Sequence, residues 1–111
     1  MAYDFGDVVL APFPFTSQAA LKQRPAVVVS SRVYNAAKPD VIIMAVTSQL
    51  HAMPSLGEVW IFEWQSANLL RPSAIKPVFA TIEQDLIVRR LGALHAQDRS
   101  ALRAAIAVVL G

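Results

Sequence analysis

Short apolar runs recur along this chain, separated by polar or proline-containing segments. Residues 7–13, 25–31 and 41–48 are rich in Val, Ile, Leu or Phe for most of their length. Residues 7–13 predict a strand, and Pro12 favours an edge position or a bend near its end. The runs at 25–31 and 41–48 predict buried strands, as in a small barrel. Residues 74–82 predict a further extended segment, in which Pro77 favours an edge position.

The segments between these runs predict loops and a few short elements. Residues 16–23 and 50–57 are expected to be loops, and residues 31–40 a connection with one helical turn. Residues 58–64 alternate enough between apolar and polar positions to predict a strand. Residues 65–70 predict a short helix.

The clearest helix is expected at the C-terminal end of the sequence. The side chains that repeat there at the spacing of one helical face are Leu102, Ile106, Val109 and Leu110. Asp98 lies in the predicted first turn, where a carboxylate interacts favourably with the helix dipole, and Gly111 stands at the stop. Several short strands and one terminal helix predict a mainly β fold, a small antiparallel barrel or curled sheet with helices attached.

Length and composition predict one domain, residues 1–111, with a real core. Apolar residues make up 55% and charged residues 16% of the chain, which excludes a disordered protein. The longest apolar runs, 41–46 and 104–110, fall far short of the ~20 residues that cross a bilayer. The beginning of the sequence lacks a signal pattern, so a cytoplasmic protein without membrane contact is expected. The surplus of apolar residues favours a subunit interface.

The chain has no cysteine and only two histidines, His51 and His95. Disulfides and thiolate zinc sites are therefore excluded. Neither histidine has a cluster of acidic residues near it in the sequence. No metal site and no cofactor are expected.

The net charge is only +2, but the basic residues are unevenly distributed. No acidic residue lies between Asp7 and Asp40. The basic residues of that interval are Lys22, Arg24, Arg32 and Lys38, and a second group comprises Arg89, Arg90, Arg99 and Arg103. Such stretches attract phosphates and acidic segments, although ordinary solubilising charge explains the composition equally well.

Arg24 stands directly before Pro25, at the mouth of a predicted strand. A residue before proline is biased towards extended backbone, so Arg24 should project from the start of that strand. If the strand at 41–48 pairs antiparallel with the strand at 25–31, its end returns to Arg24. An assumed register would place Thr47 opposite Arg24, with Ser48 beside them.

A guanidinium and two hydroxyls on one rim suit a phosphodiester. Guanidinium offers paired donors to phosphate oxygens, and a hydroxyl adds a donor for the charge of the transition state. RNA supplies its own nucleophile, the neighbouring 2′-OH, so cleavage requires neither a metal nor a protein nucleophile. Arg-Pro and Thr-Ser are common dipeptides, so spacing alone does not separate catalysis from chance.

Other residues have both a functional and a structural interpretation. His51 can serve as a general acid or base, or it is a plain surface histidine. The aromatic stripe of Trp60, Phe62 and Trp64 can stack bases, but such stripes are more often core or interface. Arg89 and Arg90 can extend an RNA track or form a solvated edge.

Two short motifs predict structural roles. Tyr34 and Asn35 are expected to cap or pack the turn after a strand. Gly6 is expected to provide backbone freedom at the entry of the first strand, and Asp7 a local hydrogen bond there.

The sequence resembles the MazF/PemK family of toxins from toxin–antitoxin pairs, over nearly its whole length. The stretches that carry the resemblance are GDVVLAPFPF (6–15), RPAVVVSS (24–31), YN (34–35), VTSQ (46–49), residues 75–94 and residues 101–111. Gly-Asp, Arg-Pro and Thr-Ser in this order are much more specific than any one of them.

The resemblance implies an SH3-like antiparallel barrel of the MazF/CcdB type with a C-terminal helix, usually as a homodimer. It implies metal-independent and ribosome-independent cleavage of single-stranded RNA, including mRNA, that leaves a 2′,3′-cyclic phosphate and a 5′-OH. The family's motif arginine falls on Arg24, which would contact the scissile phosphate, stabilise its extra charge and could also move a proton. The family's strand-end threonine falls on Thr47, which would position that phosphate. Ser48 and Gln49 would help shape the site, and Lys22 and Gln23 would border it.

The family resemblance also implies a cognate antitoxin that covers the RNA groove with an acidic segment. Some family members carry a glutamate in the loop before Arg-Pro, and this loop has none. The general base is therefore unassigned, with Gln18, Lys22 and His51 as nominees. Two alternatives stay open: a gyrase-poisoning toxin of the same fold, and a non-catalytic RNA-binding barrel.

Overall fold

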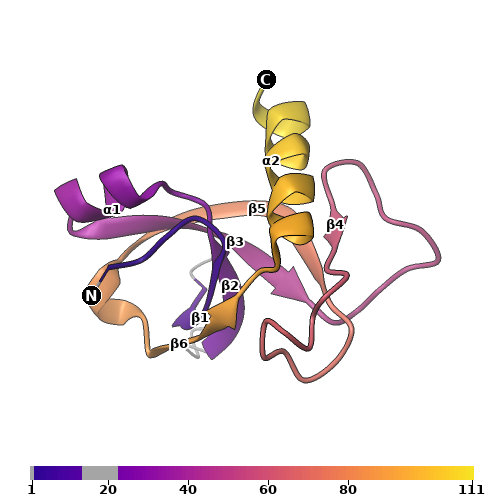
Figure 1. The fold of residues 1–111 in the computed structure, drawn as a ribbon, viewed down its shortest axis with the longest axis horizontal. Coiled ribbons are helices and arrows are strands. Elements are labelled where there is room, and N and C mark those ends of the chain that lie inside the picture. The colour runs from indigo at the N-terminus through magenta and orange to yellow at the C-terminus, as the bar shows by residue number, and fades with distance from the viewer. Residues whose placement is uncertain (1, 14–22) are drawn as a thin grey trace.

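The computed structural model describes residues 2–13 and 23–111. Within them, six strands form one antiparallel sheet in the spatial order β4-β5-β3-β2-β1-β6 (Figure 1). The strands are β1 (Asp7–Pro12), β2 (Gln23–Val28), β3 (Asp40–Thr47), β4 (Val59–Trp60), β5 (Ala74–Glu83) and β6 (Arg89–Ala93). The helices are α1 (Arg32–Ala37), α2 (Ala96–Leu110) and a short 3₁₀ helix, η1 (Gln84–Leu86). No helix among the described residues is long and apolar enough to cross a membrane.

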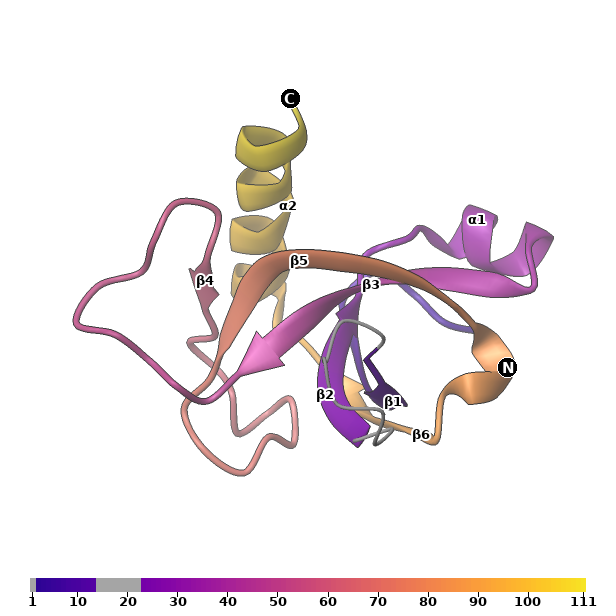
Figure 2. The ribbon, with the colours of Figure 1, turned by 180° about the vertical axis from the view of Figure 1, so that it is seen from behind.

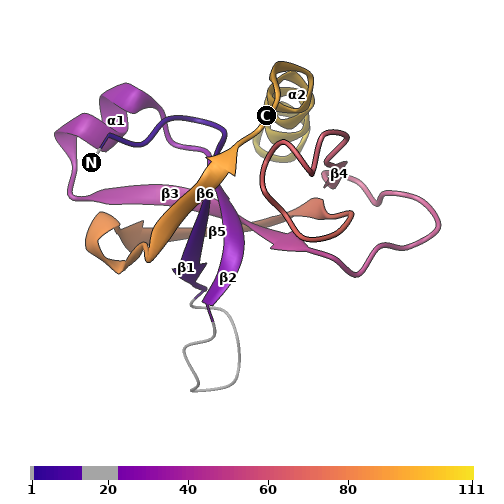
Figure 3. The same cartoon turned by 60° about the horizontal axis from the view of Figure 1, so that its bottom comes forward.

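The sheet curls into a half-barrel, and β5 arches across it (Figure 2). Helix α1 lies at one end of the long strands β3 and β5, and β4 lies at the other (Figure 3). The predicted strands at the start of the chain, at 25–31, at 41–48 and at 74–82 are confirmed, with small changes of bounds. The predicted C-terminal helix is also confirmed.

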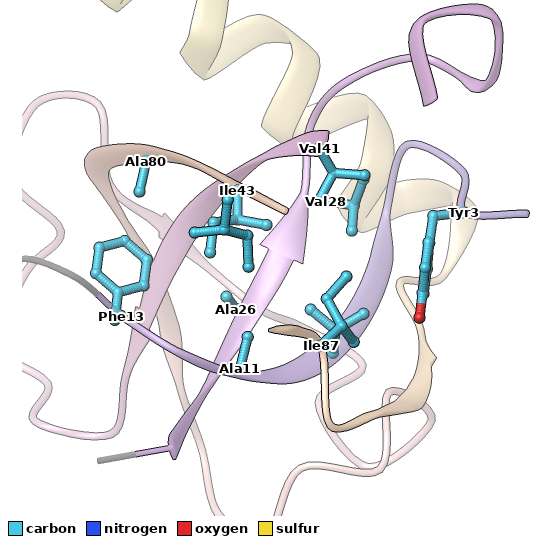
Figure 4. Packing of buried hydrophobic residues seen from close by; sticks show 11 residues of the cluster. Tyr3, Ala11, Phe13, Ala26, Val28, Val41, Ile43, Ala80 and Ile87 are labelled. Carbon is cyan, nitrogen blue, oxygen red and sulfur yellow. The ribbon is translucent and has the colours of Figure 1, made fainter. Parts of the chain in front are cut away.

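Strands β1 and β3 and the second half of β2 are largely buried, because apolar clusters lie on each side of the sheet. One cluster fills the space between the curled strands (Figure 4) and consists of Tyr3, Val9, Ala11, Phe13, Ala26, Val28, Val41, Ile43, Ala80, Ile82 and Ile87. The other cluster joins the opposite face of the sheet to α2 and to residues 61–69. Leu102 of α2 is fully buried there.

Strand β2 pairs with β3 in the expected register. Ala26 lies opposite Ala45, and Val28 lies opposite Ile43. The connection contains α1, whose N-cap residue Ser31 accepts a hydrogen bond from the backbone N–H of Tyr34 at 3.1 Å. Continued by two residues, this register brings the positions of Arg24 and Thr47 opposite each other.

Strand β5 carries a wide bulge where it passes Ala45. Met44 pairs with Phe79 and Val46 pairs with Ile75, so residues 76–78 lie against a single residue of β3. Pro77 lies within this bulge, where its missing N–H removes no hydrogen bond between the strands.

The predicted helix at 65–70 is wrong, and the predicted strand at 58–64 is confirmed only in part. The strand covers only Val59–Trp60, and residues 65–70 form turns instead of a helix. The strand ends early beside Asp98, which is buried and accepts hydrogen bonds from the backbone N–H groups of Phe62 and Glu63, both at 2.9 Å. These bonds hold the chain in a turn immediately after β4.

Strand β6 was not predicted, because its sequence RRLGA looks like a solvated edge. It pairs with β1, with Arg90 opposite Val9. The Arg90 guanidinium forms an ion pair with Asp7 at 2.9 Å and donates to the carbonyl of Ala2 at 2.6 Å. Arg90 therefore has a structural role.

The structural roles expected for two motifs are confirmed. Asn35 is buried and donates to the carbonyls of Tyr3 and Ser30, and Tyr34 donates to the Asp40 carboxylate at 2.8 Å. Gly6 has a φ of 92°, a left-handed conformation that favours glycine.

Asp7, next to Gly6, accepts a local hydrogen bond from the backbone N–H of Asp4 at 2.8 Å. The bond closes the tight turn that leads into β1, as the sequence predicted.

Candidate functional site

An open groove of about 650 Å³ lies where β2 begins and β3 ends. The residues that line it are Phe13, Arg24, Pro25, Ala45, Val46, Thr47, Ser48, Gln49, Leu69, Leu70, Arg71, Ser73, Lys76 and Val78. The lining combines an apolar floor with three cations and several hydroxyl or amide groups. None of these described lining residues is acidic, so the groove favours an anionic ligand.

Arg24 projects from β2 at the rim of this groove. It lies beside Ala11 of β1 and is exposed. In the described part of the chain, its guanidinium makes no hydrogen bond or ion pair. A guanidinium carries five N–H donors in a planar fork, which suits an anionic ligand.

Thr47 is the last residue of β3 and is half-buried. Its hydroxyl oxygen accepts a hydrogen bond from the backbone N–H of Gln49 at 3.1 Å. That bond orients the side chain and leaves the O–H as a donor. Ser48 and Gln49 follow on the exposed rim of the same groove.

Each cation of the groove stands directly before a proline. The three dipeptides are Arg24-Pro25, Arg71-Pro72 and Lys76-Pro77. A residue before proline is biased towards extended backbone, so the backbone conformation at each of these cations is restricted. Lys38 also precedes a proline, but it lies at the end of α1, outside the groove.

The groove brings together only part of the predicted set. Arg24, Thr47, Ser48 and Gln49 share it, whereas Gln23 and His51 are exposed and do not line it. The predicted residues Gln18 and Lys22 lie outside the described residues.

Sequence reasoning missed two of the groove's cations, Arg71 and Lys76. The signal that could have identified them is the cation–proline pattern that singled out Arg24. Their distance along the chain from Arg24 concealed that they meet it.

The aromatic stripe does not line the groove. The exposed fraction is 38% for Trp60 and 69% for Phe62, and Trp64 packs partly against the cluster beneath α2. These side chains therefore belong to another surface of the molecule.

A second hollow of about 340 Å³ lies beside α1. It is lined by Ala2, Tyr3, Arg32, Asn35, Ala36, Lys38 and Gln84. Polar groups of this hollow are engaged within the protein. Arg32 forms an ion pair with Asp4. The Gln84 amide donates to the backbone carbonyls of Asn35, Lys38 and Asp40. The hydrogen bond from Arg32 holds the pKa of Asp4 below its ordinary value, and Asp4 raises the pKa of Arg32. This hollow is a structural junction.

Comparison with protein families gives one decisive match. A model described as a PemK-like, MazF-like toxin of type II toxin–antitoxin systems matches residues 4–110. The chain belongs to this toxin family. A comparison with curated protein sequences finds no match.

Solved structures of MazF toxins have the same fold as this family member. An endoribonuclease from a mycobacterial species has a TM-score of 0.78 at 20% identity, covering 100% of this chain and 93% of its own. A MazE–MazF structure from Deinococcus radiodurans has a TM-score of 0.77 at 22% identity, covering 100% and 98%. A mycobacterial endoribonuclease in complex with its cognate antitoxin has a TM-score of 0.75 at 18% identity, covering 99% and 94%. The predicted MazF-type β fold with a C-terminal helix is confirmed.

Proposed function

We propose that this toxin is an endoribonuclease that cleaves single-stranded RNA in the groove, without a metal or the ribosome. The observation that carries the proposal is the β2–β3 register, which leads Arg24 and Thr47 to one rim of an acid-free groove. The neighbours described as endoribonucleases support the same activity. Cleavage of mRNA would inhibit translation and growth.

In the proposed reaction, the 2′-OH of the RNA attacks the adjacent phosphorus. A bond from the 2′ oxygen to phosphorus forms as the bond to the 5′ oxygen breaks, which leaves a 2′,3′-cyclic phosphate and a 5′-OH. The Arg24 guanidinium donates to the non-bridging oxygens and stabilises the extra negative charge. The Thr47 hydroxyl donates to the same phosphate and fixes its position.

Two protons must move in this reaction: the 2′-OH loses one, and the leaving 5′ oxygen gains one. The group that takes the first proton is unassigned. Gln18, Lys22 and His51 stay the nominees, and His51 reaches the groove only if its exposed segment moves.

The proposed partners are a second copy of the chain and a cognate antitoxin, all in the cytoplasm. Exposed apolar side chains on α2 and on the segments around β4 support the homodimer; they include Val108, Leu110, Leu56 and Phe62. The antitoxin would neutralise the three groove cations with an acidic segment. One fold neighbour is itself in complex with its cognate antitoxin.

The test is incubation of the purified toxin with an unstructured RNA in a metal chelator, with the product ends mapped. We expect RNA to be cut to cyclic phosphate and 5′-OH ends, while DNA of the same sequence stays intact because it lacks the 2′-OH. Intact RNA across several varied sequences would refute the nuclease. In that case, stalled gyrase–DNA complexes would favour a gyrase poison. RNA binding without cleavage would favour a non-catalytic RNA-binding barrel.

A further inference from the structure

One wall of the groove is formed by residues 69–73, which lead from the turns after β4 into strand β5. The residues of this segment that line the groove are Leu69, Leu70, Arg71 and Ser73. We call residues 69–73 the groove wall, and they belong to no helix or strand. The end of the wall is attached to the sheet, because the carbonyl of Ser73 accepts a hydrogen bond from the backbone N–H of Ile61 at 2.9 Å. The position of its start depends on the preceding residue, Asn68.

Asn68 attaches the start of the groove wall to strand β6. Its side-chain amide donates a hydrogen bond to the backbone carbonyl of Leu91 at 2.6 Å. The register of β6 with β1 shifts between Val8 and Val9, so Leu91 is the extra residue of a β-bulge. Figure 3 shows the segment between β4 and β5 beside the end of β6. The bulge on the edge strand therefore presents the carbonyl that Asn68 binds.

The backbone is specialised on both sides of this contact. Among the described residues, Asn68 is the one non-glycine residue with a positive φ, 61°, a conformation that asparagine adopts more readily than most residues. On β6, Gly92 allows the close approach. A Cβ atom at Gly92 would lie 3.0 Å from the carbonyl oxygen of Ala67 and 3.1 Å from Nδ2 of Asn68. We call Asn68 and Gly92 together the β6 lock.

The β6 lock is separate from the elements that hold Arg24 and Thr47. Those two residues are placed by the pairing of β2 with β3. The Asn68 side chain is exposed, so its hydrogen bond contributes only modestly to the stability of the whole fold. Loss of the lock should release the start of the groove wall and leave Arg24 and Thr47 in place.

We propose that Asn68 is a positioning residue for RNA, which fixes the groove wall against one side of the bound strand. This rests on the proposed function, in which RNA occupies the groove. A wall that is fixed before binding removes the entropic cost of ordering residues 69–73 in the complex. Loss of the lock therefore weakens RNA binding and leaves the cleavage rate at saturation close to that of the wild type.

The test measures single-turnover cleavage of one mapped RNA over a range of toxin concentrations, for the wild type and three lock variants. Asn68→Gly keeps the positive φ and removes the donor. Asn68→Asp keeps the shape but presents an ionised carboxylate, which cannot donate, to the Leu91 carbonyl. Gly92→Ala disturbs the same contact from the β6 side. Asn35→Ala, a buried change outside the groove, is the control for a general loss of stability.

Hydrogen exchange of backbone amides reports on the groove wall without RNA. The backbone N–H of Leu69 donates to the carbonyl of Trp64 at 3.1 Å, and this bond should open more often when the lock is lost. We expect faster exchange in peptides that cover residues 69–73 of each lock variant, and unchanged exchange in β2 and β3.

We expect each lock variant to raise the half-saturating concentration roughly tenfold, while the saturating rate stays within about twofold of the wild type. Combining Asn68→Gly with Gly92→Ala should add little to the worse single variant, because both remove one contact. Asn35→Ala should keep the wild-type half-saturating concentration.

An unchanged half-saturating concentration in the three lock variants would overturn the proposal, as would a loss confined to the saturating rate. Unchanged exchange in residues 69–73 would also overturn it, even with weaker RNA binding. If the wild type cleaves no RNA, the proposed function fails, and with it the role of the lock towards RNA. Faster exchange in the variants would then still show that the lock fixes the groove wall.

Discussion

Asn35 shows how one buried polar residue ties together distant parts of the chain. Its amide donates to the carbonyl of Tyr3 at 2.9 Å and to that of Ser30 at 3.1 Å. The side-chain carbonyl of Asn35 accepts a hydrogen bond from the Ser30 hydroxyl. The Ser30 hydroxyl oxygen in turn accepts a hydrogen bond from the backbone N–H of Ile42 at 3.0 Å. The network joins the N-terminal segment to α1 and β3, and through them supports the β2–β3 register.

We predict that Asn35→Ala lowers the free energy of unfolding by about 2–3 kcal/mol, because it leaves buried partners without hydrogen bonds. Denaturant unfolding measures this loss, with Val33→Ala on the exposed side of α1 as the control. The folded Asn35→Ala protein should keep the wild-type KM for RNA. A loss no larger than that of the control would show that the network contributes little.

At the scale of elements, Asp98 links α2 to the turn after β4. From the sequence, only a favourable interaction of Asp98 with the helix dipole was predicted. Its hydrogen-bond partners, the backbone N–H groups of Phe62 and Glu63, lie more than thirty positions earlier, so no local pattern indicates them. The same long-range bonds explain why the alternating pattern of residues 58–64 gave only a two-residue strand. Local periodicity cannot report a turn that is imposed by a distant carboxylate.

Asp98→Asn is expected to cost about 2–3 kcal/mol of folding free energy, since an amide can accept from one N–H but places its own donors against the other. Thermal or denaturant unfolding would measure the cost. Asp85→Asn, at an exposed carboxylate in η1, is the matched control and should change little. Equal effects of the two substitutions would contradict the role given to Asp98.

Strand β6 marks a second limit of the sequence at this scale. Its two arginines suggest solvent, yet the strand pairs with β1, and Arg90 forms the ion pair with Asp7. The strand pattern of β1, β2 and β3 was readable because each contains a short continuous apolar run. An edge strand with one polar face carries a much weaker signal.

At the scale of the whole molecule, the N-terminal segment is held against α1 by the ion pair of Asp4 with Arg32. The hydrogen bond from Arg32 lowers the pKa of Asp4, so this carboxylate stabilises the fold while it is ionised. That contribution is complete above the unfolded pKa, about 3.9, and disappears as the pH falls through the folded value.

We therefore predict that Asp4→Asn is less stable than the wild type at neutral pH and equally stable in strong acid. Unfolding measured over a range of pH tests this, and Arg32→Gln should reproduce the same pH-dependent loss. The double variant should lose no more than either single one, because both remove the same pair. If the stability deficit of Asp4→Asn persists at low pH, the deficit does not come from loss of the ionised carboxylate.

The groove also belongs to this largest scale. Arg24 and Thr47 could be placed together from the sequence because one antiparallel pairing, with one register, relates them. Arg71 and Lys76 reach the same groove through the bulge of β5 and the segment before it, and no local pattern predicts that bulge.

The central claim is that Arg24 works on the scissile phosphate of RNA. The most direct measurement is the single-turnover cleavage rate of one mapped RNA by the wild type, Arg24→Ala and Arg24→Lys, each checked for its fold, with Lys38→Met as the charge control. The account predicts a loss of roughly 10²–10³-fold in Arg24→Ala, a smaller loss in Arg24→Lys, and a wild-type rate in the control. Cleavage by folded Arg24→Ala at the wild-type rate would contradict it.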